Sequence, residues 1–140
     1  MNEIIKMVVG FDQRESVAYH TFVQSVIEKS SMPVSFTPLS INTLKDYEEK
    51  HEERSNDFVY SRFLTPYLNN FEGWAIFADG DMICQADIRE LWDLRDESKA
   101  VLVVKHDYKT KANKKYLGNK NENYPKKKLV KSDFMELQSS

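Results

Sequence analysis

The sequence predicts an α/β fold built on a largely parallel sheet, because apolar strands alternate along it with helical segments. Residues 4–9 form an apolar run that suits a strand covered on both faces, and an amphipathic helix follows it. Apolar strands are also expected in residues 73–81, ahead of a short helix, and in residues 99–108. This order of elements is typical of a sheet flanked by helices.

The first helix is expected to begin at Asp12, whose side chain can cap it while Glu15 reaches back from the third position. Its apolar residues recur at helical spacing, and it ends near Lys29, before the breaking sequence "SSMP". The alternating residues of "VSFTPL" then predict a second strand, which Pro38 closes.

The middle of the chain is less regular. Residues 46–57 are polar and charged, and we expect a surface helix or an excursion from the fold there. A helix resumes near Phe58, and Pro66 should kink or divide it. After the third strand, "ADIRELWDL" predicts a short helix, whereas residues 109–124 show little periodicity and predict a loop.

Length and composition limit the class of protein. At 140 residues the chain is expected to form one domain or part of one, and its 41% hydrophobic content is that of a globular protein. No apolar run approaches the roughly 18 residues of a membrane span, and the N-terminus lacks the features of a signal peptide. The single cysteine, Cys84, excludes an internal disulfide framework, so we expect a cytoplasmic setting.

The formal net charge of −2 conceals an uneven distribution of charge. Residues 1–98 carry 9 basic and 18 acidic side chains, whereas residues 99–131 carry 11 lysines and two acids. Such a cationic stretch attracts nucleic acid, an anionic membrane or a phosphorylated ligand, or it is a solvated loop. Its few interleaved aromatic residues and the lack of a recognised motif argue against nucleic acid as the partner.

Acidic residues follow two of the expected strands. Ligands of parallel α/β sheets bind at the carboxyl ends of strands, where the segments Gly10–Asp12 and Asp79–Asp81 are both expected. Residues two apart in an extended chain point the same way, so Asp79 and Asp81 can project together. Gly80 between them has no Cβ, which allows an unusual turn and the close approach of a ligand.

Two carboxylates aimed at one place suit a hard divalent cation such as Mg²⁺ or Mn²⁺, with substrate phosphates and water completing its shell. Such an ion would neutralise a diphosphate and stabilise it as a leaving group. A tight turn after a strand is the other interpretation of these three residues. A calcium loop does not fit the apolar "MICQ" that follows, and residues this close in sequence are poorly placed to flank a glycosidic bond.

The sequence around these residues resembles a known family. "IFADGDMI", between an apolar strand and "DIRELWDL", is similar to the D-x-D region of nucleotide-sugar glycosyltransferases with the Rossmann-like GT-A fold. "GFDQRESVAYHTFVQSVIEKSSMPVSFTPL", "SNDFVYSRFLTPYLNNFEGWAIFADGDMI" and "VLVVKHDYKTKANKKYLGNKNENYPKK" resemble, in order, a bacterial group of family-8-like transferases. The resemblance covers roughly residues 3–127.

The resemblance implies transfer of a sugar from a nucleotide diphosphate sugar, usually UDP-linked, to a hydroxyl of an acceptor glycan, lipid or protein. It implies that Asp79 and Asp81 hold Mn²⁺ or Mg²⁺ between the two phosphates. The residues that it places at the nucleotide or donor are Gly10, Phe11, Asp12, Arg62, Ala78, Asp79 and Gly80.

Several of these residues also have structural interpretations. Phe11 can lie against the base or in the core, and Arg62 can reach the donor or pair with Asp57 or another nearby acid on a helix surface. His106 and Asp107, at the end of the fourth expected strand, are possible site-lining residues. His20, His51 and Cys84 are expected to be structural or solvated.

The C-terminal part departs from the family. Relatives continue past "NYPKK" with a tryptophan-containing segment that helps to form the acceptor cleft, whereas this chain reads "KLVKSDFMELQSS". We therefore expect residues 1–127 to be the nucleotide-sugar- and metal-binding part of a GT-A domain, and residues 128–140 a divergent or truncated tail that leaves a sheet edge unpaired. The alternatives are an inactive, truncated transferase that acts as a nucleotide-sugar-binding or assembly module, and a nucleic-acid-binding protein using residues 99–131.

Overall fold

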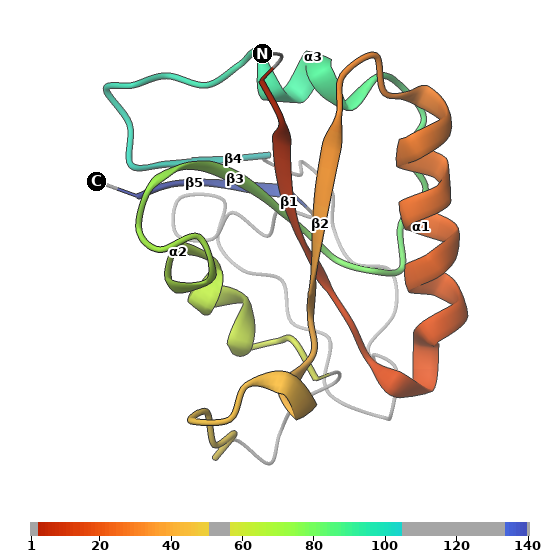
Figure 1. The fold of residues 1–140 in the computed structure, drawn as a ribbon, viewed down its shortest axis with the longest axis vertical. Coiled ribbons are helices and arrows are strands. Elements are labelled where there is room, and N and C mark those ends of the chain that lie inside the picture. Colours follow the sequence, from red (N-terminus) through yellow and green to blue (C-terminus); the bar gives the residue numbers. More distant parts are fainter. Residues whose placement is uncertain (1–2, 51–56, 105–133, 140) are drawn as a thin grey trace, which may run out of the picture.

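The computed structural model of the protein describes residues 3–50, 57–104 and 134–139. It shows a five-stranded sheet in the order β2-β1-β3-β5-β4 (Figure 1). The strands are β1 (Ile5–Gly10), β2 (Val34–Leu39), β3 (Gly73–Ala78), β4 (Val101–Val103) and β5 (Phe134–Ser139). β1 pairs in parallel with β2 and with β3, whereas β5 runs antiparallel to both β3 and β4.

The predicted α/β class, with a parallel part of the sheet and flanking helices, is confirmed. Beyond residue 127, β5 pairs with all six residues of β3, so β3 is not left as an edge strand. The fourth expected strand is shorter than its apolar sequence suggested: β4 covers three residues, and Val101 is 46% exposed. β4 is an edge strand of the sheet that the described residues form.

The helices follow the expected order. A 3-10 turn, η1 (Gln13–Glu15), leads into α1 (Ser16–Lys29), and α3 (Ile88–Trp92) follows β3. The 3-10 turn η2 (Ile41–Thr43) follows β2. None of the helices in the described ranges is both long and apolar enough to cross a bilayer.

Pro66 divides the helix expected after Phe58, as predicted. It lies in the first turn of α2 (Thr65–Leu68), and the chain before it forms the 3-10 turn η3 (Ser61–Leu64). Proline is tolerated in a first helical turn because no intrahelical hydrogen bond is lost there. Of the charged segment expected as a surface helix or excursion, residues 46–50 and 57 are described, and they form no helix.

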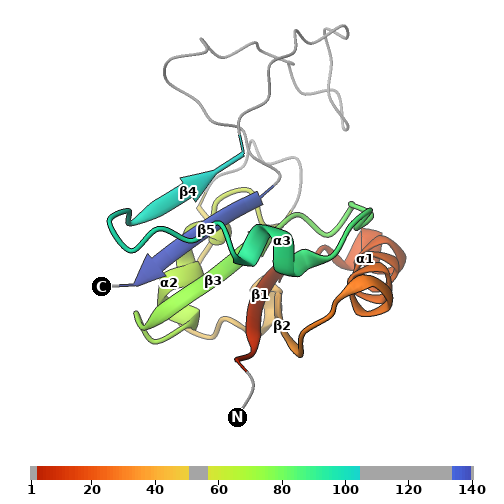
Figure 2. The same cartoon turned by 90° about the horizontal axis from the view of Figure 1, so that it is seen from above.

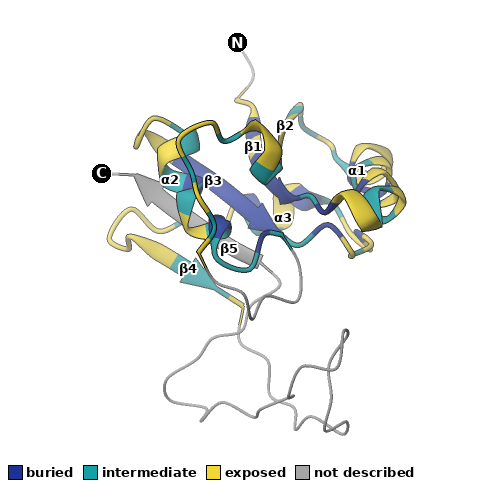
Figure 3. Ribbon diagram, turned by 90° about the horizontal axis from the view of Figure 1, so that it is seen from below, coloured by how far each residue is buried: buried dark blue, intermediate teal, exposed yellow. Residues whose placement is uncertain are grey.

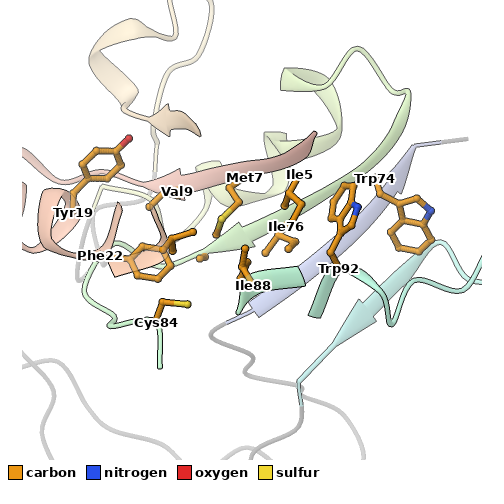
Figure 4. Packing of buried hydrophobic residues seen from close by; sticks show 12 residues of the cluster. Ile5, Met7, Val9, Tyr19, Phe22, Trp74, Ile76, Cys84, Ile88 and Trp92 are labelled. Atoms are coloured by element: carbon orange, nitrogen blue, oxygen red, sulfur yellow. The ribbon is translucent and has the colours of Figure 1, made fainter. Parts of the chain in front are cut away.

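The two faces of the sheet are covered by different helices. Successive residues of a strand point to opposite faces, so β1 places Met7 in one core cluster and Val8 in another. The first core cluster comprises Ile5, Met7, Val9, Tyr19, Phe22, Val26, Trp74, Ile76, Ala78, Cys84, Ile88 and Trp92. α1 and α3 supply its helical residues, which lie along β1 and β3 in Figure 4.

The second core cluster, on the opposite face, comprises Val8, Leu39, Phe58 and Phe77. Leu68 of α2 packs against it, and Figure 2 shows α2 and α1 on opposite sides of β1 and β3. β3 is buried from Trp74 to Ala78, as its dark blue ribbon in Figure 3 shows. Each fully buried aliphatic or aromatic side chain contributes about 1.5–3 kcal/mol, so this central pair of strands forms a rigid base for the residues that follow it.

Candidate functional site

The carboxyl ends of β1 and β3 meet at a point where the direction of strand addition reverses. The chain leaves β1 for β2 on one side and later returns to β3 on the other side of β1. Crevices at such reversal points are the usual ligand sites of open α/β sheets. Val9 lies opposite Ala78 in the parallel register, so Gly10 and Asp79 follow at corresponding positions. The two segments that the sequence singled out are therefore brought together.

Two glycines allow this close packing. A Cβ on Gly80 would lie 2.3 Å from the carbonyl oxygen of Gly10, a distance that no real side chain tolerates. A Cβ on Gly10 would lie 2.6 Å from the Phe58 ring on the second core cluster. The structure thus gives a reason for glycine at position 80, the close approach of the β1 backbone, and the approach of a ligand to Gly80 stays a prediction.

Asp12, which follows β1, is almost completely buried and is 2% exposed. Its carboxylate accepts hydrogen bonds from the backbone N–H and the Nε of Arg14, each at 2.9 Å, and from the Nη2 of Arg14. The backbone N–H of Asp57 donates a fourth, at 3.3 Å. The Arg14 side chain is the main cause that holds the pKa of Asp12 below its usual value, so this carboxylate is ionised at neutral pH.

Asp79, directly after β3, forms an ion pair with Arg62. Its Oδ1 lies 3.1 Å from Nη2 of Arg62, and each side chain is 16% exposed. The Arg62 guanidinium also lies over the Phe77 ring at 5.1 Å, and its Nε donates to the Phe58 carbonyl at 3.2 Å. Of the two interpretations of Arg62, pairing with a nearby acid is observed, and that acid is a member of the D-x-D segment.

Asp81 is exposed, two residues further along the same turn. The negative charge of Asp81 acts on the Glu15 carboxylate, which lies in η1 just before α1. Burial is the main cause that raises the pKa of Glu15; the charges of Asp81 and Asp12 raise it further, and Arg14 opposes them. The edge of the sheet at Asp79, Asp81 and Glu15, called the rim below, therefore carries an excess of negative charge.

Two other predicted donor residues belong to the core. Ala78 is completely buried in the first core cluster. Phe11 is partly buried against the same cluster, with its ring edge-to-face to Tyr19 at 5.3 Å between centroids. Phe11 therefore makes the core contact that one of its two interpretations expects, and its contact with the base stays a prediction.

The remaining residues discussed from sequence are core or surface residues, or lie outside the described residues. Cys84 is buried in the first core cluster, as expected, and burial raises the pKa of its thiol. His20 is exposed and lies edge-on to Tyr19. His51, His106 and Asp107 lie outside the described residues.

Sequence reasoning missed Arg14 and treated Glu15 only as a helix-capping residue. The signal was present in "DQRE", because an arginine two residues after an aspartate can fold back onto it. What the sequence alone does not show is that Asp12 is buried, and burial is what makes this short-range pair necessary.

The acids at the rim fit a divalent ion only if a ligand supplies part of its shell. Within the described ranges, no group of three or more His, Cys, Asp or Glu side chains is arranged to hold a metal. Asp79 and Asp81 provide two carboxylates, the number that Mg²⁺ sites commonly use together with substrate phosphates. The excess negative charge near Asp81 favours a cation there.

Comparison with known proteins identifies relatives of this chain. A family model described as "Glycosyl transferase family 8" matches residues 5–134. Protein CDI of Arabidopsis thaliana is 40% identical over 126 residues, which are 87% of this chain and 49% of that protein. The chain therefore spans about half the length of this curated relative.

Among solved structures, the apo structure of WbbM, described as a bifunctional glycosyltransferase, is similar with a TM-score of 0.58. The match covers 76% of this chain and 24% of WbbM at 16% sequence identity. At that identity the likeness shows the fold alone. It confirms the fold class, and the family match confirms the resemblance noted in the sequence.

Proposed function

The chain belongs to glycosyl transferase family 8, and from this premise we propose that it is the donor-binding portion of a metal-dependent sugar transferase. The proposed donor is a nucleotide diphosphate sugar, UDP-linked, and the sugar passes to a hydroxyl of an acceptor glycan, lipid or protein. One observation carries the proposal. The acids that follow β3 lie against the end of β1, at the point of the sheet where ligands of this fold class bind.

Asp79 and Asp81 are the proposed ligands of Mn²⁺ or Mg²⁺. When bound, the ion would neutralise the diphosphate and stabilise it as a leaving group. The proposal is supported by the position of Asp81 beside Asp79 in the turn after β3, and by its negative charge, which is the second cause, after burial, of the raised pKa of Glu15. A cation at Asp81 would offset this repulsion, whereas a simple tight turn would gain nothing from placing acids so close.

Arg62 is proposed to bind the donor diphosphate or sugar from the β3 side. Its guanidinium is fixed by the Phe58 carbonyl and lies over the Phe77 ring, so its position is determined before any ligand arrives. A planar guanidinium presents a rigid set of donors that match phosphate oxygens. Its ion pair with Asp79 places it beside the proposed metal ligand.

The direct test is isothermal titration of the protein with UDP in the presence and absence of Mn²⁺, for the wild type and for Asp81→Ala. We expect Mn²⁺-dependent binding by the wild type and a loss of about tenfold or more in the variant, because one of two protein ligands is removed. Asp93→Ala is the matched control: Asp93 is also exposed, but it lies directly after α3, where it pairs with Arg89. Equal binding by wild type and Asp81→Ala, or none by either, would contradict the proposal.

Turnover is tested separately from binding, because the chain spans about half of Protein CDI. A radiolabelled UDP-sugar is incubated with the protein and Mn²⁺, and release of free sugar is followed. Hydrolysis that Asp81→Ala lacks would support a transferase site, since water is the simplest acceptor hydroxyl. Binding without any turnover would instead assign the chain to a nucleotide-sugar-binding module.

A further inference from the structure

Each of the two strand ends carries an aspartate that is paired with an arginine, and so far only Arg62 has been given a role at the ligand. We propose that Arg14 is a second diphosphate-binding residue, and that Asp12 is the positioning residue that holds its guanidinium at the rim. This inference rests on the proposed function, because it concerns the same nucleotide. It departs from the sequence-based expectation that Asp12 itself contacts the nucleoside.

Both oxygens of the Asp12 carboxylate already accept hydrogen bonds from groups of the protein. Arg14 engages both of its oxygens through Nε and Nη2, while the backbone N–H groups of Arg14 and Asp57 complete its hydrogen bonds. With 1% of its side chain exposed, the carboxylate has no surface for a ligand to touch. Asp12 can therefore affect a ligand only indirectly, by holding the Arg14 guanidinium in place.

Arg14 differs from its partner in exposure. Its side chain is 48% exposed, against 1% for Asp12 and 16% for Arg62 in the other pair. A guanidinium that binds a buried carboxylate along one edge is held in position, while about half of the Arg14 side chain is exposed. Fixing the side chain in advance lowers the entropic cost of binding an oxyanion, which is the usual advantage of arginine over lysine at phosphate sites.

Arg14 lies directly beyond the end of β1, in η1. The end of β1 is in close contact with the turn that carries the proposed metal ligands, since a Cβ on Gly80 would lie 2.3 Å from the Gly10 carbonyl oxygen. A diphosphate brought to Asp79 and Asp81 by a divalent ion would therefore meet Arg62 from the β3 side and Arg14 from the β1 side. Two guanidinium groups and a metal would together balance the negative charge of the phosphates.

The experiment compares UDP with uridine, which has the same base and ribose but no phosphate. Both are titrated against the wild type, Arg14→Gln and Arg14→Lys in Mn²⁺, with circular dichroism to establish that each variant is folded. We expect Arg14→Gln to weaken UDP binding about tenfold, the effect of losing one charge-assisted contact, and to leave uridine binding within about twofold. Arg14→Lys keeps the positive charge but lacks the planar set of N–H donors of a guanidinium, so it should lose less affinity for UDP than Arg14→Gln does.

Arg89→Gln is the matched control, since Arg89 is a half-exposed arginine paired with Asp93 on α3. It should bind both ligands as the wild type does. Asp12→Asn tests the positioning role: releasing the guanidinium should lower the affinity for UDP while uridine binding is retained, a difference that general loosening of the fold would not produce. If Arg14→Gln does not fold, the ratio of UDP to uridine affinity in Arg14→Lys decides.

The possible failures are distinguishable. A wild type that binds neither UDP nor uridine overturns the proposed function and this inference with it. A wild type that binds UDP while Arg14→Gln binds it equally well overturns the inference alone. Equal losses for UDP and uridine would also overturn it, because they would show that Arg14 supports the nucleoside or the fold and makes no contact with the phosphates.

Discussion

The ends of β1 and β3 are neighbours in the sheet, and both are followed by aspartates, yet their surroundings differ. Asp12, after β1, is 2% exposed and accepts four hydrogen bonds from its own chain. After β3, Asp79 is partly buried beside Arg62, and Asp81 is exposed. The hydrogen-bonding capacity of the carboxylate after β1 is thus used by the protein, whereas one of the two carboxylates after β3, that of Asp81, is exposed.

This difference separates a structural from a functional use of the same residue type. A buried carboxylate that lacks hydrogen-bond donors costs several kcal/mol, so Asp12 must keep its partners for the chain to fold. An exposed carboxylate such as Asp81 lowers the stability of the fold little, because water solvates it, and it can exchange that water for a metal ion. Substitutions at the two strand ends should therefore divide between loss of stability and loss of ligand binding.

The largest expected effect comes from the contact that joins the two ends. Gly80→Ala would place a Cβ 2.3 Å from the Gly10 carbonyl oxygen, and because this neighbour is backbone, the turn after β3 must move. We expect the free energy of unfolding to fall by about 3 kcal/mol, the upper part of the range for overpacking, in urea denaturation. Gly73→Ala is the control: its φ of +67° is strained for alanine, but no atom lies within 4 Å, so about 1 kcal/mol is expected. Equal losses would show that the two strand ends are not in tight contact.

The second prediction separates the aspartates themselves. Asp12→Asn removes the charge that Arg14 and the backbone N–H groups stabilise, and should lower the free energy of unfolding by about 2 kcal/mol. Asp81→Asn, at an exposed position, should change it by less than about 0.5 kcal/mol while weakening Mn²⁺-dependent UDP binding. Denaturation and titration of both variants test this division. The comparison fails if Asp81→Asn is the more destabilising.

The third prediction concerns acid. The folded-state pKa of Asp12 lies below its ordinary value of 3.8, so ionisation of Asp12 stabilises the folded state. That contribution is fully present above about pH 4 and is lost as the pH falls from there toward the folded-state pKa. The stability difference between wild type and Asp12→Asn should therefore be constant from pH 7 to 5 and shrink below pH 4. Urea denaturation at pH 7, 5 and 3 measures it; a difference that persists unchanged at pH 3 would contradict the role of the charge.

Much of the fold was predictable because its signals are local. Apolar runs and helical periodicity identify β1, α1 and β3 within a few residues of their observed bounds. β5 was not predicted, because residues 134–139 contain polar residues and are a strand through pairing with β3, more than fifty residues earlier in the chain. The segment 99–108 shows the opposite error, since apolar residues suggested a buried strand where β4 is a short edge strand.

The site was predictable to the level of the strand ends and no further. The sequence shows that acids follow β3 and that Gly10 ends the apolar run of β1. Which arginine pairs with which acid depends on the path of the chain between them: Arg62, seventeen positions before Asp79, reaches it only because η3 lies beside the end of β3. The role of Gly80 likewise depends on the backbone of another strand.

The smallest expected effect is at Glu15, whose pKa is raised by the charges of aspartates at both strand ends, Asp81 and Asp12, in addition to burial. Burial, followed by the charges of Asp81 and Asp12, raises its pKa, so its ionised form costs stability at neutral pH, and this cost is absent below its ordinary pKa of 4.5. Glu15→Gln should therefore raise the free energy of unfolding at pH 7 by a few tenths of a kcal/mol, with no gain near pH 4.

A double-mutant cycle with Asp81→Asn isolates the part of this effect that comes from the end of β3. In the Asp81→Asn background, the gain from Glu15→Gln should be smaller, because the charge that repels Glu15 has been removed while its burial is unchanged. A gain that is identical in both backgrounds would mean that Asp81 does not influence Glu15, and that the ends of β1 and β3 are electrostatically independent.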